Sequence, residues 1–142
     1  MDRRPGCPAV LMVGLLTGFL INACDVTTTV VFVAAEWEGV LRSQGLTPSG
    51  WTPPFYVSAN FMGGIIWVAA YSVFRRALAP TPATALSVSL LIWGISRLYG
   101  AGHVVMGQMS AHIFAIMSGG LLAGYLLGGQ VGRWALERRL RG

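Results

Sequence analysis

The chain contains no lysine, few acidic residues and two cysteines. Ten basic residues, all arginine, stand against five acidic ones, and charged residues make up 11% of the 142 positions. A soluble globular domain has about 25% charged residues, so this composition argues against one. The net charge of +5 could favour nucleic-acid binding, but the arginines form short clusters beside apolar segments. That placement is typical of a membrane protein that fixes its orientation, and we expect no nucleic-acid partner.

Common catalytic and redox motifs are also missing. There is no CxxC, GxSxG, HExxH, phosphate-binding loop or dinucleotide fingerprint. Cys7 and Cys24 are 17 residues apart, which on one helix separates them by ~25 Å at ~1.5 Å per residue. A disulfide needs Cα atoms within about 7 Å, so no intrachain bridge is expected. These absences predict a protein that is not an enzyme.

Long apolar segments are what the chain does have. Hydrophobic residues make up 54% of it, and roughly 20 consecutive apolar residues suffice to cross a bilayer. The sequence predicts a single all-α domain over 1–142, a polytopic integral membrane four-helix bundle. Its expected spans are 8–33, 55–74, 81–99 and 108–131.

Two connecting stretches have a clear character. Residues 34–46 form an amphipathic pattern that predicts an interfacial helix, with Trp37 and Leu41 facing inward and the charged residues outward. The GAGH sequence beginning at Gly100 predicts the end of the third span, because glycine is a poor helix former.

The arginines predict the orientation. With four spans, both termini and the turn between the second and third spans share one side of the membrane. That side holds Arg3, Arg4, Arg75, Arg76, Arg133, Arg138, Arg139 and Arg141. The opposite side holds Arg42 and Arg97. Short arginine-rich flanks stay cytoplasmic, so both termini should be cytoplasmic.

The beginning of the chain has a second interpretation. MDRR, an apolar run and INAC resemble a secretory signal that ends in a lipoprotein cleavage box at Cys24. Asn22 fits such a box poorly, and the apolar run continues past it into VTTTVVFVAA. An uncleaved first span is the favoured interpretation.

Four polar residues fall inside the expected spans: Asn22, Asp25, Asn60 and Arg97. A charge in the hydrocarbon costs at least about 2.5 kcal/mol and usually finds a partner. Counted along their helices, Asp25 and Arg97 lie at matching depth in the outer half of the membrane. We expect an Asp25–Arg97 ion pair with Asn22 and Asn60 nearby as its hydrogen-bond partners, either as a structural staple or as part of a polar ligand site.

Small residues recur every three to four positions on several spans. The set comprises Gly14, Gly18, Gly64, Gly120, Gly124, Gly128 and Gly132. Such ladders let helix backbones approach closely in lipid. They predict packing within the bundle, and the ladder of the fourth span could also dock against another subunit.

His103, Met106, Met109 and His112 form the one pattern with metal-like chemistry. Imidazole and thioether suit copper, and one histidine can ligate haem or a chlorophyll-type pigment. Steps of three residues turn a helix by about 300° each, so the four side chains spread over half of its circumference. The favoured interpretation is packing and interfacial residues, with a cofactor site as the alternative.

The chain resembles an uncharacterised bacterial family of small four-helix integral membrane proteins. The similar segments are GLLTGFLINACD, EWEGVLRSQGL, NFMGGIIWVAAYSVFRRAL and ALSVSLLIWGI, with the glycine-rich fourth span. The likeness covers about residues 11–133 and implies the four-span fold and no assigned activity.

Three functions remain open on sequence grounds. The leading hypothesis is a non-catalytic accessory subunit of an inner-membrane complex, bound to other membrane proteins or to itself. The second is a cofactor-binding subunit that uses His103 or His112. The third is a small transporter or channel component that uses the polar cluster.

Overall fold

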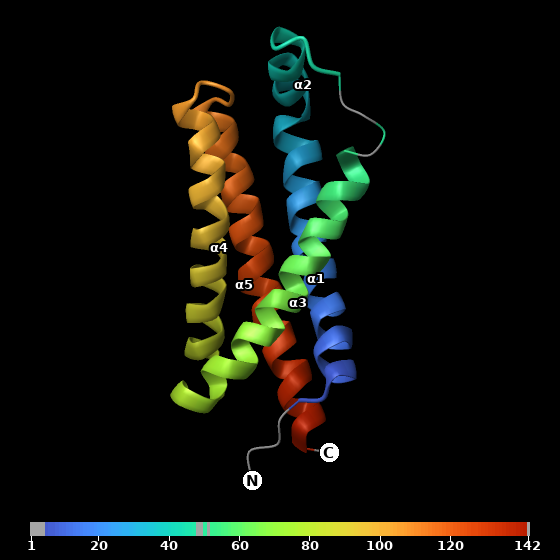
Figure 1. Cartoon of the computed structure of the whole chain (residues 1–142), viewed down its shortest axis with the longest axis vertical. Helices are drawn as coiled ribbons and strands as arrows, with labels where there is room; N and C mark the ends of the chain where they lie inside the picture. Colours follow the sequence, from blue (N-terminus) through green and yellow to red (C-terminus); the bar gives the residue numbers. More distant parts are fainter. Residues whose placement is uncertain (1–4, 48–49, 51, 142) are drawn as a thin grey trace.

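The computed structural model describes residues 5–47, 50 and 52–141, and all its regular elements are helices (Figure 1). In chain order these are α1 (Cys7–Thr28), η1 (Thr29–Val33), α2 (Ala34–Ser43), α3 (Thr52–Leu78), α4 (Pro82–Val105) and α5 (Ala111–Arg141).

Four helices are long and apolar enough to cross a membrane. The first is the continuous run Cys7–Ser43, which comprises α1, η1 and α2, and the others are α3, α4 and α5. Each has at least the roughly 20 residues that a span requires. The prediction of an all-helical chain with four candidate membrane spans is confirmed.

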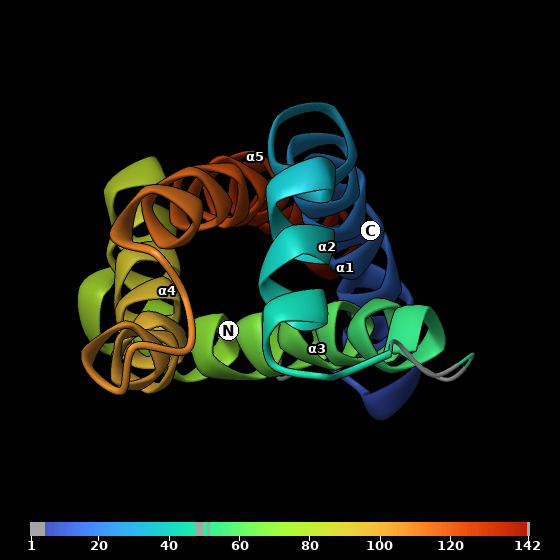
Figure 2. The ribbon, with the colours of Figure 1, turned by 90° about the horizontal axis from the view of Figure 1, so that it is seen from above.

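α1 lies at the centre of the packing. It packs against α3 and α5, whereas α4 packs mainly against α5 and less extensively against α3. Figure 1 shows α3 crossing the other helices obliquely, and Figure 2 shows the helices surrounding the bundle axis as seen from above. α4 is therefore the candidate span with the fewest neighbours.

The core is built around two stacked aromatic rings on α3. Trp67 and Tyr71 have no exposed surface, and their ring centroids are 5.1 Å apart with the planes 9° from parallel. Ile21 on α1, Val88 on α4 and Leu136 on α5 are equally buried in the same core. Residues from all four long helices thus share one core.

Two expected helix ends lie elsewhere. α4 continues through Gly100 and Gly102 to Val105, so the predicted end at Tyr99 is wrong. Mid-helix glycine costs only about 1 kcal/mol, less than unpaired backbone groups would cost in hydrocarbon. The chain instead turns at Gly107, whose φ of +70° suits glycine.

α5 is also longer than its expected span, which ended at residue 131. The helix runs on to Arg141, so the arginine-rich tail is part of it. Arginine and leucine are good helix formers, and the tail contains no proline or internal glycine after Gly132. At the start of α3, Thr52 rather than Phe55 is the first helical residue.

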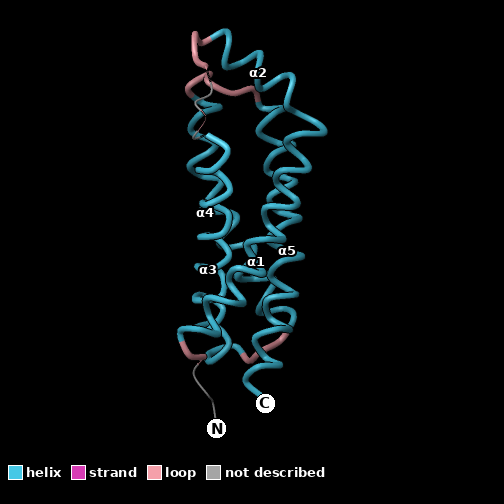
Figure 3. Tube along the Cα trace, turned by 90° about the vertical axis from the view of Figure 1, so that its right-hand side faces the viewer, coloured by secondary structure: helices cyan, strands magenta, loops and turns pink. Residues whose placement is uncertain are grey.

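α2 behaves largely as the amphipathic pattern predicts. Trp37 and Leu41 are half-buried, and Glu36, Glu38 and Arg42 are exposed. Figure 3 shows α2 inclined over one end of the bundle, beyond the π-helical turn η1. A π-helical turn locally changes the helix direction, which accounts for the change between α1 and α2.

The two ends of the described chain lie at the same end of the bundle (Figure 1). We call this the arginine end, because the C-terminal turns of α3 and α5 place Arg75, Arg76, Arg133, Arg138, Arg139 and Arg141 there. Arg3 and Arg4, which the orientation argument also used, lie outside the described residues. The opposite end, with α2 and the α4–α5 turn, is called the far end.

Candidate functional site

Three of the predicted polar residues form one hydrogen-bonded chain between α1 and α3. The Asn60 side-chain amide donates to Asp25 Oδ2 at 2.9 Å and lies 3.2 Å from Asn22 Oδ1. Asn22 in turn donates to the Val57 carbonyl at 3.1 Å. The sequence thus identified residues that the fold brings together, although they come from positions 35 and 38 residues apart.

This chain of polar groups faces a hollow of about 310 Å³ in the far half of the bundle. We call it the Asp25 groove. Its lining combines Asn22, Asp25 and Asn60 with Trp37, Tyr56, Met109 and Met117, and with small and apolar side chains of α1, η1 and α3. A largely apolar hollow with a few converging polar groups is the usual form of a small-molecule site.

The Asp25 carboxylate is only partly used by the protein. Oδ2 accepts the hydrogen bond from Asn60, whereas Oδ1 accepts none from any described residue. Among described side chains, Ser118 Oγ is the sole fully buried polar atom without a partner, so Asp25 Oδ1 keeps some exposed surface, and Asp25 itself lines the groove. One carboxylate oxygen therefore remains available to a ligand.

The π-helical turn contributes to the same groove. Thr29 and Val30 of η1 line it, one turn beyond Asp25. π-helical turns occur frequently at functional sites, because the extra residue re-aims neighbouring side chains. The irregular backbone of η1 therefore forms part of the groove wall that a ligand would contact.

Arg97 does not form the expected ion pair with Asp25. Among the described residues, no nitrogen–oxygen contact within 4.0 Å joins the two side chains, and the Arg97 Nε–H is 3.5 Å from Ser96 Oγ. Asp25 remains close enough to act on the Arg97 guanidinium through space. The direct contact is missing because α1 packs on α3 and α5, whereas α4 lies beside α5.

The two histidines have separate partners. His103 Nδ1 lies 2.7 Å from Gln108 Oε1, and His112 Nδ1 lies 3.3 Å from Glu36 Oε2. Met106 is exposed, and Met109 lines the Asp25 groove. Within the described residues, no group of three or more His, Cys, Asp or Glu side chains could hold a metal ion.

The glycine ladders are used inside the bundle. A Cβ added to Gly64 on α3 would meet the backbone of Gly14 and Gly18 on α1. On α5, Cβ atoms at Gly120, Gly124, Gly128 and Gly132 would meet Thr28, Ile21 or Thr17 of α1. The ladder on α5 therefore packs against α1, and the same face is not available to another subunit.

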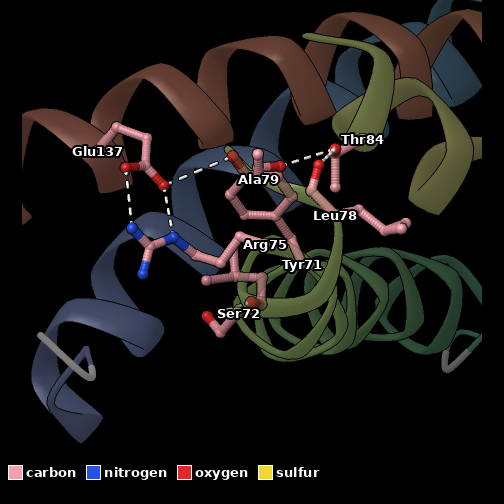
Figure 4. A network of polar contacts seen from close by, with 8 residues as sticks. Tyr71, Ser72, Arg75, Leu78, Ala79, Thr84 and Glu137 are labelled. Carbon is pink, nitrogen blue, oxygen red and sulfur yellow. Dashed lines mark hydrogen bonds and ion pairs between the residues drawn. The ribbon is translucent and has the colours of Figure 1, made fainter. Parts of the chain in front are cut away.

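A buried ion pair at the arginine end was not predicted from the sequence. Arg75 Nε and Nη2 donate to the two carboxylate oxygens of Glu137 at 2.7 and 3.1 Å, and both side chains are about nine-tenths buried. The Tyr71 hydroxyl donates to the same carboxylate at 3.5 Å (Figure 4). Glu137, one acid among arginines in GRWALERRLRG, was the available signal.

The neighbouring turn between α3 and α4 is held by Thr84. Its hydroxyl donates to the Ala79 carbonyl at 2.8 Å and lies 3.4 Å from the Leu78 carbonyl (Figure 4). Its backbone N–H donates to the Thr81 hydroxyl, which caps α4. Ala79 has a φ of +66°, a conformation usually taken by glycine after a helix.

Comparison with known protein families, with curated proteins and with solved structures finds no match for this chain. The fold and the site therefore define its class: an all-helical chain with four candidate membrane spans and a polar-lined groove. The resemblance to a bacterial four-helix family stays a prediction.

Proposed function

We propose that the chain is a multi-pass protein of a bacterial inner membrane that binds a small organic cation in the Asp25 groove, as part of a carrier. The observation that carries this proposal is the hydrogen-bonded set Asn22, Asn60 and Asp25, which opens onto a hollow of about 310 Å³. That volume lies at the lower end of the range for small-molecule pockets.

The groove favours a positively charged ligand. Asp25 is the one acidic or basic side chain among the described residues that line it, and its Oδ1 is accessible. Trp37 and Tyr56 also line the groove. Aromatic faces attract cations, most strongly where water is excluded.

The same groove favours a ligand with an apolar body. Val26, Val30 and Val57 line it, together with the two flexible thioethers of Met109 and Met117. Methionine adapts its shape to different partners, so it suits a site that accepts apolar groups of varied outline. An organic ammonium or phosphonium ion with aryl or alkyl groups has both required properties.

Arg97 supplies the compensating charge in this proposal. It acts on Asp25 through space without a direct contact, so the carboxylate is partly balanced yet keeps one oxygen for the ligand. Intramembrane charges are costly and tend to mark pathways for ions or substrates. A small carrier with four spans would gain a larger pathway by self-association.

The test uses two ions of nearly the same shape and opposite charge. Binding of tetraphenylphosphonium and of tetraphenylborate to the purified protein in detergent is measured by calorimetry. Wild type is compared with Asp25→Asn and with Glu38→Gln, which removes a carboxylate from the exposed pair with Arg42. We expect phosphonium binding by wild type and Glu38→Gln, and at least a tenfold weaker affinity in Asp25→Asn.

Equal phosphonium binding by wild type and Asp25→Asn would overturn the proposed cation site. Saturable binding of tetraphenylborate alone would mean that the groove accepts apolar bodies but not cations. If the affinity changes as expected, uptake of radiolabelled phosphonium into proteoliposomes distinguishes a carrier from a binding protein.

The accessory-subunit hypothesis keeps one structural support. α4 is the least covered of the four candidate spans, with Leu98 76% and Tyr99 80% exposed, and lipid or a partner could cover this face. A pull-down in mild detergent tests this hypothesis. Recovery of larger membrane proteins in fixed ratio would favour it, whereas recovery of the chain alone would exclude it.

A further inference from the structure

The arginine end carries a second site, which does not depend on the Asp25 groove. Two adjoining hollows of about 520 and 220 Å³ lie along the last turns of α5. Both are lined by Trp134 and Arg138. The larger also has Met12, Val13 and Leu16 of α1, and the smaller has Arg133, Glu137 and Arg141.

The larger hollow changes in polarity along its length. Met12 and Leu16 are 55% and 40% exposed and form an apolar floor on α1. Arg138 and Arg139 lie about one helical turn beyond Trp134 and Ala135, toward the end of the bundle. An apolar strip that leads into a pair of guanidinium groups matches an acyl chain and its anionic headgroup.

Among the described residues, the positive charge at this end is only partly neutralised. Glu137 is the one described side-chain carboxylate here, and Arg75 takes both of its oxygens. No described carboxylate lies within 4.0 Å of Arg133, Arg138, Arg139 or Arg141. Because Glu137 is occupied by Arg75, the outward-facing arginines of α5 can bind an external anion.

Trp134 places the site at the membrane surface. The residue is 55% exposed, and the Arg138 guanidinium lies over its ring, 5.4 Å from the centroid. Tryptophan is enriched at headgroup depth, and stacking on the ring holds the guanidinium in position. The charge is thus presented where lipid phosphates lie.

We propose that Arg138 and Arg139, with Trp134 and the apolar floor on α1, bind the headgroup and acyl chain of an anionic phospholipid. Basic pockets beside spanning helices on the cytoplasmic side commonly bind such headgroups. The orientation predicted by the arginines places this pocket in the leaflet that faces the cytoplasm. The bound lipid would bridge α1 and α5 at the end of the bundle.

The test measures lipid retention and thermal stability together. Native mass spectrometry counts the lipids that remain bound, and unfolding is followed in micelles that contain phosphatidylglycerol, cardiolipin or phosphatidylcholine at equal mole fraction. The variant is Arg138→Gln/Arg139→Gln. The control is Arg76→Gln, an exposed arginine at the same end that lines neither hollow.

We expect one or more retained anionic lipids in wild type and in Arg76→Gln, and a higher unfolding temperature with anionic than with zwitterionic lipid. Each arginine near a lipid surface contributes a factor of about five in affinity, so the double variant should lose most of both effects. Equal stabilisation by phosphatidylcholine, or equal loss in Arg76→Gln, would overturn the site. Full stabilisation by inorganic pyrophosphate without lipid would show a free phosphate site instead.

Discussion

Glu137 of α5 binds Arg75 of α3 through both carboxylate oxygens, with both side chains about nine-tenths buried. The pair joins two helices whose residues are 62 positions apart and lies against the core residue Tyr71. The ion pair holds α5 against α3 at the arginine end.

The first prediction concerns this pair. Glu137→Gln should lower the free energy of unfolding by about 3–5 kcal/mol, because the buried Arg75 guanidinium loses its ion pair with the Glu137 carboxylate. Chemical unfolding in mixed micelles measures the loss. Arg75→Met/Glu137→Leu, which removes both charges, should recover much of the stability. Glu38→Gln breaks the exposed pair with Arg42 and should cost at most about 1 kcal/mol.

The second prediction concerns the closest approach of two helices. Gly64→Ala should cost at least about 3 kcal/mol, because its methyl group would overlap backbone atoms of Gly14 and Gly18 that cannot move aside. Gly94→Ala is the matched control, since a Cβ there meets no atom within 4 Å. Because alanine has a higher helix propensity than glycine, Gly94→Ala should be as stable as wild type or slightly more stable. Similar unfolding curves for the two variants would contradict the packing of α1 on α3.

The third prediction concerns a hydrogen-bonded line across the core. The Trp67 indole N–H donates to Ser89 Oγ at 2.9 Å, and the Ser89 hydroxyl donates to the Tyr125 carbonyl at 2.9 Å. Ser89→Ala should cost about 0.6–1.7 kcal/mol, the range found for hydrogen bonds between membrane helices. A shift in Trp67 fluorescence should accompany the change, because its N–H loses a partner. Ser43→Ala, at an exposed helix end, should change neither quantity.

The fourth prediction concerns orientation. Cys7 is exposed at the arginine end, and Ser43 is exposed at the far end. In cells that express Cys24→Ala, a membrane-impermeant maleimide should label Cys7 only after permeabilisation. With Cys7→Ala and Cys24→Ala combined, Ser43→Cys should be labelled in intact cells. The reverse pattern would place both termini outside and overturn the orientation predicted by the arginines.

Of the Asp25 groove, the sequence identified the polar residues and the asparagines as hydrogen-bond partners, but it also predicted a direct Asp25–Arg97 contact that the structure lacks. Depth along a helix follows from counting residues at about 1.5 Å each, and this count brought Asp25 and Arg97 to one level. Contact also requires that the two helices be neighbours and rotated toward each other. α1 packs on α3, so Asn60 rather than Arg97 reaches the Asp25 carboxylate.

The glycine ladder on α5 likewise separates what the sequence predicts from what the tertiary structure decides. The spacing of these glycines predicted close helix packing. The structure shows such packing, because small residues at this spacing lie on one face of a regular helix. Which helix would fill that face could not be read from α5 alone. The fold places α1 there, and Thr17, Ile21 and Thr28 fill the space above the glycines.

By itself the sequence determined the helical class, the four candidate spans and the gathering of arginines at one end, because these follow from local composition and from the thickness of a bilayer. Only the tertiary structure decided which charged side chains make direct contact: Glu137 pairs with Arg75, whereas Asp25 bonds to Asn60 and not to Arg97. Such contacts depend on helix crossing and rotation, which are set by the summed packing of all the helices. No single segment encodes them.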